Sequence, residues 1–306
     1  MINNSNILLV AGTHGNELNA PWLFNEWNKK PSLIELFDLK CKTILGNPQA
    51  IECCKRYIDR DLNRSFSDEL LNDIHLNDLE VLRAREILKL YGPYGELPSK
   101  IVIDFHSTTA VMGSSIVIYG RRKADLMLAG LIQHRIGLPI YLHEEDPKQT
   151  GFLVEKWPCG IVVEIGPVAQ GLLDKKIVSQ NKLVLETCLD EISKFKLEKI
   201  NYPEKVYVHS HVASLDYPRD DSGHISSLIN SEMIYKNWIP LNDNFKIFEL
   251  INRSKESETL YENLTPVFIN EAAYMEKNIA LSFTKKETIN INKAHIDSLK
   301  NLISNN

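Results

Sequence analysis

The residues best suited to chemistry lie in the segment G-T-H-G-N-E at positions 12–17, directly after a short apolar run. His14 and Glu17 are three positions apart, and imidazole nitrogen and carboxylate oxygen are both common ligands of zinc. Gly12 and Gly15 permit the sharp backbone turns that two converging side chains need. Because an H-x-x-E pair also occurs by chance on helix surfaces, the segment predicts a metal site only together with a third ligand.

A candidate for that third ligand, His106, ends the apolar run that begins at Ile101. Sites in open α/β sheets form beyond the carboxyl ends of strands, where we expect both His14 and His106 to lie. Asp104 is then a group that fixes the orientation of the imidazole ring from behind. A core histidine that only pairs with Asp104 is the alternative interpretation.

A carboxylate at a third strand end, Glu164, stands in the β-branched run from Gly160 to Ile165. A carboxylate among apolar side chains is costly to bury unless it has a partner or a task. It is either a salt-bridged structural glutamate or a general base that faces a hydrolytic water, with a pKa kept high by desolvation.

A polar loop, R-Y-I-D-R-D-L-N-R at positions 56–64, places three arginines, two aspartates and an asparagine within nine residues. An ordinary solvated loop has such a composition. A loop that recognises anions has it too, because a guanidinium binds a carboxylate through two parallel hydrogen bonds.

The elements that must position these residues follow an alternating pattern over the first 200 residues. Apolar runs predict strands, and stretches of helical periodicity lie between them. The pattern indicates an α/β fold with a mostly parallel sheet flanked by helices. The expected strands are Ile7–Ala11, Lys42–Leu45, Ile101–Phe105, Ser115–Tyr119 and Gly160–Ile165, and the expected helices are Pro21–Lys29, Asp78–Tyr91, Ala124–Arg135 and Gln180–Phe195.

The character of the chain changes near Asn201, where short strands and turns replace the alternating pattern. We therefore expect two domains, a catalytic domain over residues 1–200 and a smaller β-rich domain over residues 201–306. The tail from Thr288 is largely polar, and we expect its last few positions to be mobile. The expected elements of this part are the strands Lys205–His209, Ile247–Leu250 and Thr265–Ile269 and a turn at Tyr217–Gly223.

Composition excludes several classes of protein. The formal net charge of −5 argues against a general nucleic-acid-binding protein, which needs a basic surface. No apolar run approaches the roughly 18 residues of a membrane helix, and the N-terminus lacks the pattern of a signal peptide. The five cysteines have no metal-type spacing, so we interpret them as thiols in a reducing cytoplasm.

An ordered set of motifs resembles the aspartoacylase and succinylglutamate desuccinylase family, most closely its aspartoacylase branch. The motifs cover nearly the full length of the chain in order, and the ordered set is far more specific than any single motif. They are G-T-H-G-N-E at 12–17, N-P-x-A at 47–50, R-Y-I-D-x-D-L-N-R at 56–64, D-F-H-S-T-T at 104–109, V-E-I-G-P at 163–167, D-Y-P-R-D at 216–220 and P-V-F-I-N-E-A-A-Y at 266–274.

The resemblance implies a zinc-carboxypeptidase-like α/β domain followed by a β-rich domain that narrows the site. It also implies one Zn²⁺ per subunit, held by His14, Glu17 and His106, and by analogy a homodimer. Its further implications for single residues are a general acid/base at Glu164, a carbonyl-polarising guanidinium at Arg56, a carboxylate-binding pair at Asn63 and Arg64, and pocket tyrosines at Tyr57 and Tyr274, the last in the same motif as Glu271. From the residues alone, Tyr274 is equally a core aromatic of the small domain.

Two departures from the family pattern concern substrate choice. Aspartate-specific members carry an arginine about ten residues before the catalytic glutamate, where this chain has Val154. They also carry a second lysine after the E-A-A-Y motif, where Lys277 is followed by Asn278. Lys148 or Lys156 is a possible substitute.

The expected reaction is hydrolysis of a small N-acyl amino acid, with N-acetyl-L-aspartate as the first candidate and acetate and L-aspartate as products. An aminoacylase for N-acyl aromatic or other amino acids and a desuccinylase are alternatives with the same chemistry. A peptidase is a further alternative, although a closed site would exclude peptides. A binding or scaffold protein that kept the fold without activity is the alternative from another class.

Overall fold

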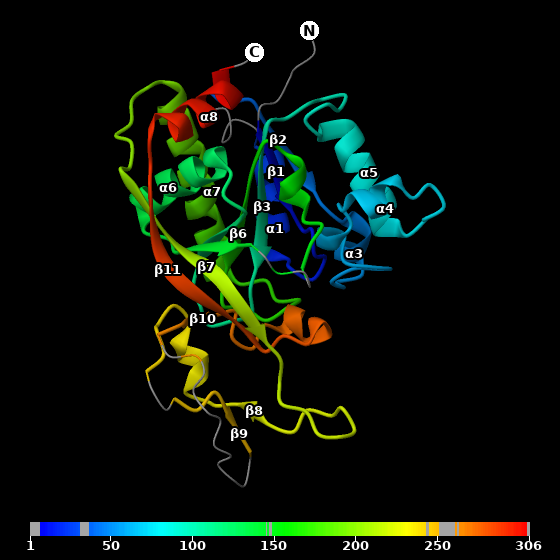
Figure 1. Cartoon of the computed structure of the whole chain (residues 1–306). Coiled ribbons are helices and arrows are strands. Elements are labelled where there is room, and N and C mark those ends of the chain that lie inside the picture. Colours follow the sequence, from blue (N-terminus) through cyan, green and yellow to red (C-terminus); the bar gives the residue numbers. More distant parts are fainter. Residues whose placement is uncertain are drawn as a thin grey trace.

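The computed structural model describes residues 7–30, 37–144, 146, 149–242, 245–250, 261 and 263–304. A nine-stranded sheet lies at the centre of this part of the chain (Figure 1), in the strand order β10-β11-β7-β5-β4-β6-β3-β1-β2. Its strands are β1 (Ile7–Ala11), β2 (Cys41–Leu45), β3 (Ile101–Ser107), β4 (Ser115–Tyr119), β5 (Ile140–His143), β6 (Cys159–Ile165), β7 (Lys205–Leu215), β10 (Thr265–Val267) and β11 (Leu281–Asn290).

The sheet is mixed. Parallel pairing joins β2, β1, β3 and β6, and it also joins β4 to β5 and β5 to β7. Antiparallel pairing joins β4 to β6, β7 to β11 and β10 to β11. The predicted fold class, a mixed sheet flanked by helices, is confirmed.

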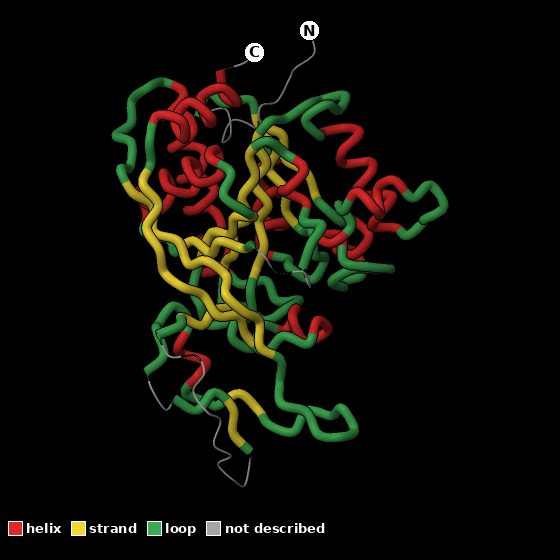
Figure 2. Tube along the Cα trace, in the orientation of Figure 1, coloured by secondary structure: helices red, strands yellow, loops and turns green. Residues whose placement is uncertain are grey.

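Helices cover both faces of the sheet (Figure 2). The helices α1 (Asn19–Asn28), α6 (Lys123–Ile136), α7 (Lys175–Lys196) and α8 (Lys293–Ser304) pack over one face, and α3 (Pro48–Glu52), α4 (Asp68–Asn72) and α5 (Leu79–Tyr91) lie on the other side. Along β1, Leu9 contributes to the core on the first face and its neighbours Leu8 and Val10 to the core on the second. Because successive side chains alternate between faces, a strand covered on both sides is apolar throughout.

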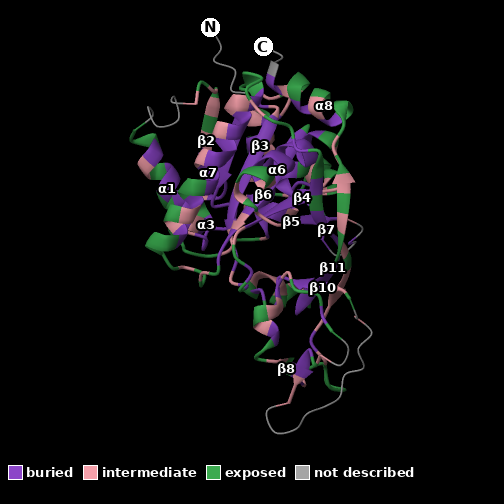
Figure 3. Ribbon diagram, turned by 90° about the vertical axis from the view of Figure 1, so that its left-hand side faces the viewer, coloured by how far each residue is buried: buried purple, intermediate pink, exposed green. Residues whose placement is uncertain are grey.

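The C-terminal part extends the sheet and adds a small end structure. A two-stranded sheet of β8 (Leu228–Ile229) and β9 (Phe248–Glu249) lies at the end of the molecule opposite to both termini (Figure 1). Buried residues gather along the central strands (Figure 3). The described chain also contains short 3₁₀ helices. These short helices are η1 (Leu62–Arg64), η2 (Leu153–Lys156), η3 (Met233–Lys236) and η4 (Ala272–Lys277).

Several expected elements differ from the structure. The strand β5 was not expected, and α7 begins five residues before the expected helix at Gln180. Where we expected a polar tail from Thr288, β11 continues to Asn290 and α8 follows, because Leu299 and Ile303 bury an apolar side against the main core. The last two positions, 305–306, lie outside the described residues.

The expected division at residue 201 stays a prediction. The strand β7, which follows it, pairs in parallel with β5, and α8 packs against α6, so elements after the division join those before it. Within the described residues, no helix is long and apolar enough to span a membrane.

Candidate active site

The carboxyl ends of three neighbouring parallel strands bring the predicted site residues together. His14 and Glu17 follow β1, His106 lies near the end of β3, and Glu164 lies near the end of β6. In the register of β3 and β6, His106 is opposite Glu164. The backbone N–H of Ser107 donates to Glu17 Oε2 at 2.7 Å, which ties the loop after β1 to the end of β3.

His14, Glu17 and His106 form a compact buried group. The Nδ1 atom of His14 lies 2.7 Å from Glu17 Oε1 and 3.1 Å from Nδ1 of His106. His106 Nδ1 lies 3.3 Å from Glu17 Oε2. Among the described residues, this is the group of histidine, cysteine and acidic side chains that could hold a metal ion, with ligand atoms within 4.8 Å of one another.

Two aspartates contact the Nε2 atoms of the His14 and His106 rings. His14 Nε2 lies 3.0 Å from Asp61 Oδ1, and His106 Nε2 lies 2.8 Å from Asp104 Oδ2. A carboxylate at Nε2 favours the tautomer with its proton there, which leaves the Nδ1 lone pair free. The Nδ1 atoms of both rings and the carboxylate of Glu17 face one another, so the donor set fits a divalent metal.

The charges around this group differ between its two glutamates. Burial alone would raise the pKa of Glu17, but His14 and His106 hold that pKa well below its usual range, so its carboxylate is ionised. Burial raises the pKa of Glu164 to about 8, and the carboxylates of Glu17 and Glu271 add to the rise while His106 and Arg56 oppose it. Glu164 is thereby suited to accept and return a proton near neutral pH.

Arg56 lies beside the buried group. Its Nη2 donates to Asp61 Oδ2 at 2.9 Å, and its Nη1 lies 3.8 Å from Glu17 Oε1. The carbonyl of Arg56 accepts the N–H of Gly15 at 3.1 Å, which fastens the polar loop to the loop after β1. The Arg56 Nε atom is buried without a hydrogen-bond partner among the described residues.

Asn63 and Arg64, which close the polar loop, have well-defined contacts. Asn63 Oδ1 accepts the N–H of Leu153 at 3.0 Å, which leaves the amide nitrogen of its side chain for another acceptor. Arg64 Nη2 donates to Gln149 Oε1 at 2.7 Å, and its guanidinium lies 4.1 Å above the centre of the Phe152 ring. The positive charge of Arg64 is thus held beside the cavity by groups that do not neutralise it.

A cavity joins these side chains. Its lining includes most of the residues predicted from the sequence and three aromatic side chains that the sequence did not indicate, Tyr119, Phe152 and Phe268. The full lining is His14, Glu17, Arg56, Asn63, Arg64, His106, Ser107, Tyr119, Phe152, Glu164, Phe268, Glu271, Ala273 and Tyr274.

The two predicted pocket tyrosines differ in position. Tyr274 lines the cavity, whereas Tyr57 does not appear in its lining and donates its hydroxyl to Glu276 at 2.6 Å instead. Glu271 accepts from the backbone N–H of Thr109 at 2.8 Å and of Ala110 at 3.1 Å. This buried carboxylate therefore fastens the segment with Tyr274 to the loop that follows His106.

Two positions at which aspartate-specific family members carry a cation are Val154 and Asn278 in this chain. Val154 is fully buried in the core, so it does not face the cavity, and Phe152 faces it instead. Asn278 directly follows η4, and its Oδ1 accepts from Arg219 at 2.8 Å. Lys156 pairs with Asp68 at 2.6 Å, and Lys148 lies outside the described residues. Among the described lining residues, Arg56 and Arg64 are the cations.

The mixed sheet and the buried group at its carboxyl edge define a zinc-carboxypeptidase-like fold with a candidate metal centre. The sequence profile described as "Succinylglutamate desuccinylase/Aspartoacylase catalytic domain" matches residues 3–192, and that of the "AstE/AspA barrel-sandwich hybrid domain" matches residues 204–286. The chain belongs to this succinylglutamate desuccinylase/aspartoacylase family, and it is a hydrolase that acts on the amide bonds of acylated amino acids.

Individual relatives agree with the family assignment. A "Probable aspartoacylase" of Prochlorococcus marinus is 52% identical over 301 residues, which cover 97% of this chain and 98% of the relative. Murine aminoacylase 3 has a crystal structure similar to this one, with a TM-score of 0.82, 29% identity and coverage of 94% and 97%. The succinylglutamate desuccinylase of Chromobacterium violaceum, at 17% identity and a TM-score of 0.61 over 93% and 85% of the two chains, shares the fold.

Proposed function

We propose that the protein is a zinc-dependent deacylase of small N-acyl-L-amino acids. The observation that carries this proposal is the convergence of His14, Glu17 and His106 with their Nδ1 and carboxylate atoms facing one another, beside Glu164. One Zn²⁺ per subunit fits this donor set, since both imidazoles are oriented by aspartates from behind.

The residues of the chain divide the chemistry among them. When bound, zinc acts as a Lewis acid that lowers the pKa of water and polarises a carbonyl oxygen. Glu164 accepts the proton of the attacking water and returns it to the leaving amine, which its raised pKa permits. The guanidinium of Arg56 stabilises the negative charge that develops on the carbonyl oxygen.

The α-carboxylate of the substrate is held by Asn63 and Arg64 in this proposal. The side-chain nitrogen of Asn63 is left available by the bond from Leu153, and Arg64 offers a charge that its contacts with Gln149 and Phe152 do not neutralise. Fixing the α-carboxylate places the scissile amide over the buried group, and such orientation lowers the entropy cost of the reaction.

N-acetyl-L-aspartate is the first candidate substrate, with acetate and L-aspartate as products. Relatives that are 52% identical to this chain carry the name "Probable aspartoacylase", which supports this candidate. This substrate has a second carboxylate, which needs a cationic partner. The described lining residues do not provide one, since Arg56 and Arg64 already have roles.

An N-acyl amino acid with an uncharged, aromatic side chain is the second candidate. Phe152 and Tyr119 favour it, because their rings lie 4.0 Å apart and form an apolar wall of the cavity next to Arg64. Aromatic side chains pack well against such walls, whereas a carboxylate loses hydration there.

A substrate panel distinguishes these candidates. The zinc-loaded protein would be assayed with N-acetyl-L-aspartate, N-acetyl-L-tyrosine and an N-succinyl amino acid, with release of the free amine as the readout. A higher kcat/KM for the aspartate derivative supports the first candidate, and a higher value for the tyrosine derivative supports the second. Preference for the succinyl group would indicate a desuccinylase, and turnover of none would contradict the proposed function.

The cellular setting belongs to the same proposal. All five cysteines are free thiols, which supports a reducing cytoplasm. The acidic net charge supports a small-molecule substrate rather than nucleic acid. A homodimer is proposed by analogy with relatives, and sedimentation analysis of the purified protein would test it.

A further inference from the structure

A fully buried carboxylate outside the cavity, Glu80 in the first turn of α5, accepts four hydrogen bonds. Its Oε1 accepts from the side-chain nitrogen of Asn47 at 3.0 Å and from the backbone N–H of Ile58 at 2.7 Å. Its Oε2 accepts from the backbone N–H groups of Asp59 and Arg60, both at 3.1 Å. Three consecutive amides of the polar loop therefore converge on one side chain.

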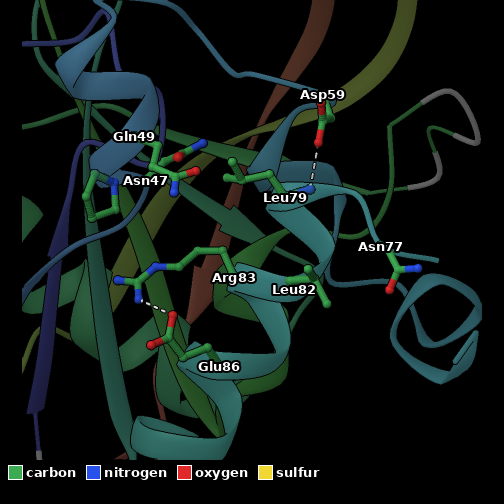
Figure 4. A pocket seen from close by; sticks show the side chains of 9 residues that line it. Asn47, Gln49, Asp59, Asn77, Leu79, Leu82, Arg83 and Glu86 are labelled. Carbon is green, nitrogen blue, oxygen red and sulfur yellow. Dashed lines mark hydrogen bonds and ion pairs between the residues drawn. The ribbon is translucent and has the colours of Figure 1, made fainter. Parts of the chain in front are cut away.

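Side chains of the polar loop also contact the start of α5. Asp59 Oδ2 accepts the N–H of Leu79 at 2.8 Å, and Arg60 Nε lies 2.5 Å from Asp78 Oδ2. Figure 4 shows this contact between the polar loop and α5, where Asp59 points to the helix at Leu79. The helix and the loop are thus fixed to each other in both directions.

The amides that Glu80 holds stand between two groups of the candidate active site. Arg56 lies two residues before them and Asp61 directly after them. Asp61 contacts Nε2 of His14 with one oxygen and Nη2 of Arg56 with the other. A displacement of this stretch would therefore move both the ring of His14 and the guanidinium of Arg56.

The carboxylate-binding end of the loop has anchors of its own. Arg64 is held by Gln149 and Phe152, and Asn63 by the N–H of Leu153. These contacts come from a different part of the chain than α5, so Asn63 and Arg64 have anchors that do not involve Glu80.

We infer that Glu80 is a positioning residue for deacylation, which fixes the backbone at residues 58–60 and through it Asp61, His14 and Arg56. The inference rests on the proposed function. The two oxygens of the Glu80 side chain accept all four hydrogen bonds. A glutamine would instead direct its own N–H₂ group at backbone N–H donors.

Glu80→Gln tests this role, with Glu191→Gln as the matched control. Glu191 is also a buried glutamate of a helix, but it lies on α7 and its ion-pair partners are Arg135 at 3.7 Å and Lys194 at 3.5 Å. We expect Glu80→Gln to lower kcat by roughly 100-fold, the loss typical of a reacting group displaced by about 1 Å. KM should stay within about threefold, because Asn63 and Arg64 keep their anchors.

Zinc affinity, measured by competition with a chelator, is the second readout. We expect Glu80→Gln to weaken it by roughly tenfold, as for other changes behind a metal ligand, and Glu191→Gln to leave it unchanged. This readout does not require turnover, so it decides on Glu80 even if the wild-type protein hydrolyses no N-acyl amino acid and the proposed function fails.

Glu80→Gln with wild-type kcat and zinc affinity would overturn the inference, and so would equal losses in the control. If Glu80→Gln does not fold, Glu80→Asp carries the same comparison, since it keeps both oxygens on a side chain one methylene shorter. Wild-type kcat and zinc affinity in Glu80→Asp would then overturn the inference, and a lowered kcat with unchanged KM would support it.

Discussion

Single residues of the candidate site are oriented by carboxylates that lie behind them. Asp61 and Asp104 fix the two imidazole rings, and Glu271 fixes the segment that contains Tyr274. Each carboxylate limits the rotation of a group that faces the cavity. Catalytic geometry of this kind depends on supporting side chains as much as on the reacting ones.

Glu164→Gln gives a prediction at this scale. The amide has nearly the same shape but cannot accept a proton, so we expect kcat to fall by roughly 100- to 10,000-fold. Zinc content, measured by metal analysis, should stay near one ion per chain, because Glu164 is not part of the His14, Glu17 and His106 group. Loss of zinc in this variant would make Glu164 a ligand and contradict its role as the base.

Arg64→Ala gives the second prediction. Removing a charged hydrogen-bond donor from the substrate carboxylate typically costs about 1.5–3 kcal/mol. We therefore expect kcat/KM to fall roughly 10- to 150-fold, mostly through a higher KM, in steady-state assays with a carboxylate-bearing substrate. Unchanged kinetics would remove Arg64 from the pocket, and Arg135→Ala, on α6 with Glu191 as its ion-pair partner, is the control.

At the scale of elements, the loop after β1 and the helix α3 approach each other very closely. A Cβ atom built on Gly15 would lie 2.1 Å from the backbone carbon of Ala50, far inside any real contact. The small residue is required there because the loop that contains His14 and Glu17 lies directly on α3. The polar loop reaches the same point through the bond from Gly15 to Arg56.

Gly15→Ala should therefore displace the loop after β1 that contains His14 and Glu17. We expect a loss of about 1–3 kcal/mol in the free energy of unfolding, since backbone must shift to admit the methyl group. Turnover should fall by roughly 100-fold through misplaced ligands. Gly137→Ala is the control: its φ of 72° makes it strained, but nothing lies near its Cβ and it is remote from the site. Equal turnover in both variants would contradict the prediction.

The C-terminal helix α8 provides a prediction about stability alone. Leu299 is fully buried against the core that α6 and α7 share. Leu299→Ala should lower the free energy of unfolding by about 2–5 kcal/mol, measured by urea denaturation. The kcat of the folded protein should not change, because α8 does not reach the cavity lining. Asp297→Ala, at an exposed position of the same helix, should be close to neutral.

At the scale of the whole molecule, the cavity is completed from both ends of the chain. The sheet supplies His106 and Glu164 near its centre, whereas Phe268, Glu271 and Tyr274 come from the segment between β10 and β11. Since β10 and β11 extend the same sheet through β7, the cavity and the core share one framework. Changes at the group of His14, Glu17 and His106 are thus expected to affect the stability of the molecule.

Removal of metal tests this coupling. The Nδ1 atoms of His14 and His106 face each other at 3.1 Å in the buried group. We expect chelation to abolish turnover and to lower Tm, since a ligand at 100 times its Kd adds about 2.7 kcal/mol to the free energy of unfolding. Added zinc should restore both, as followed by calorimetry and by assay. An unchanged Tm together with full activity after chelation would contradict a metal centre.

The sequence by itself determined which residues approach one another at the strand ends. The apolar runs before His14, His106 and Glu164 predicted strands of a mostly parallel sheet, and parallel strands bring their carboxyl ends to one edge. That the three strands are neighbours was decided by the fold. The resemblance added the site residues of the polar loop, of which Tyr57 lies apart from the cavity. Glu80 was not found, although a glutamate among the core-facing positions Val81, Ala84 and Ile87 of one helix is a possible signal.

Tertiary structure alone decided which side chains face the cavity. Counting residues before Glu164 led to Val154, but the chain turns at η2 so that Val154 enters the core and Phe152 lines the cavity. The position of α8 was decided in the same way, by burial of a few apolar side chains in an otherwise polar segment. Sequence patterns report local periodicity, whereas the direction of a side chain in an irregular loop depends on contacts with residues far along the chain.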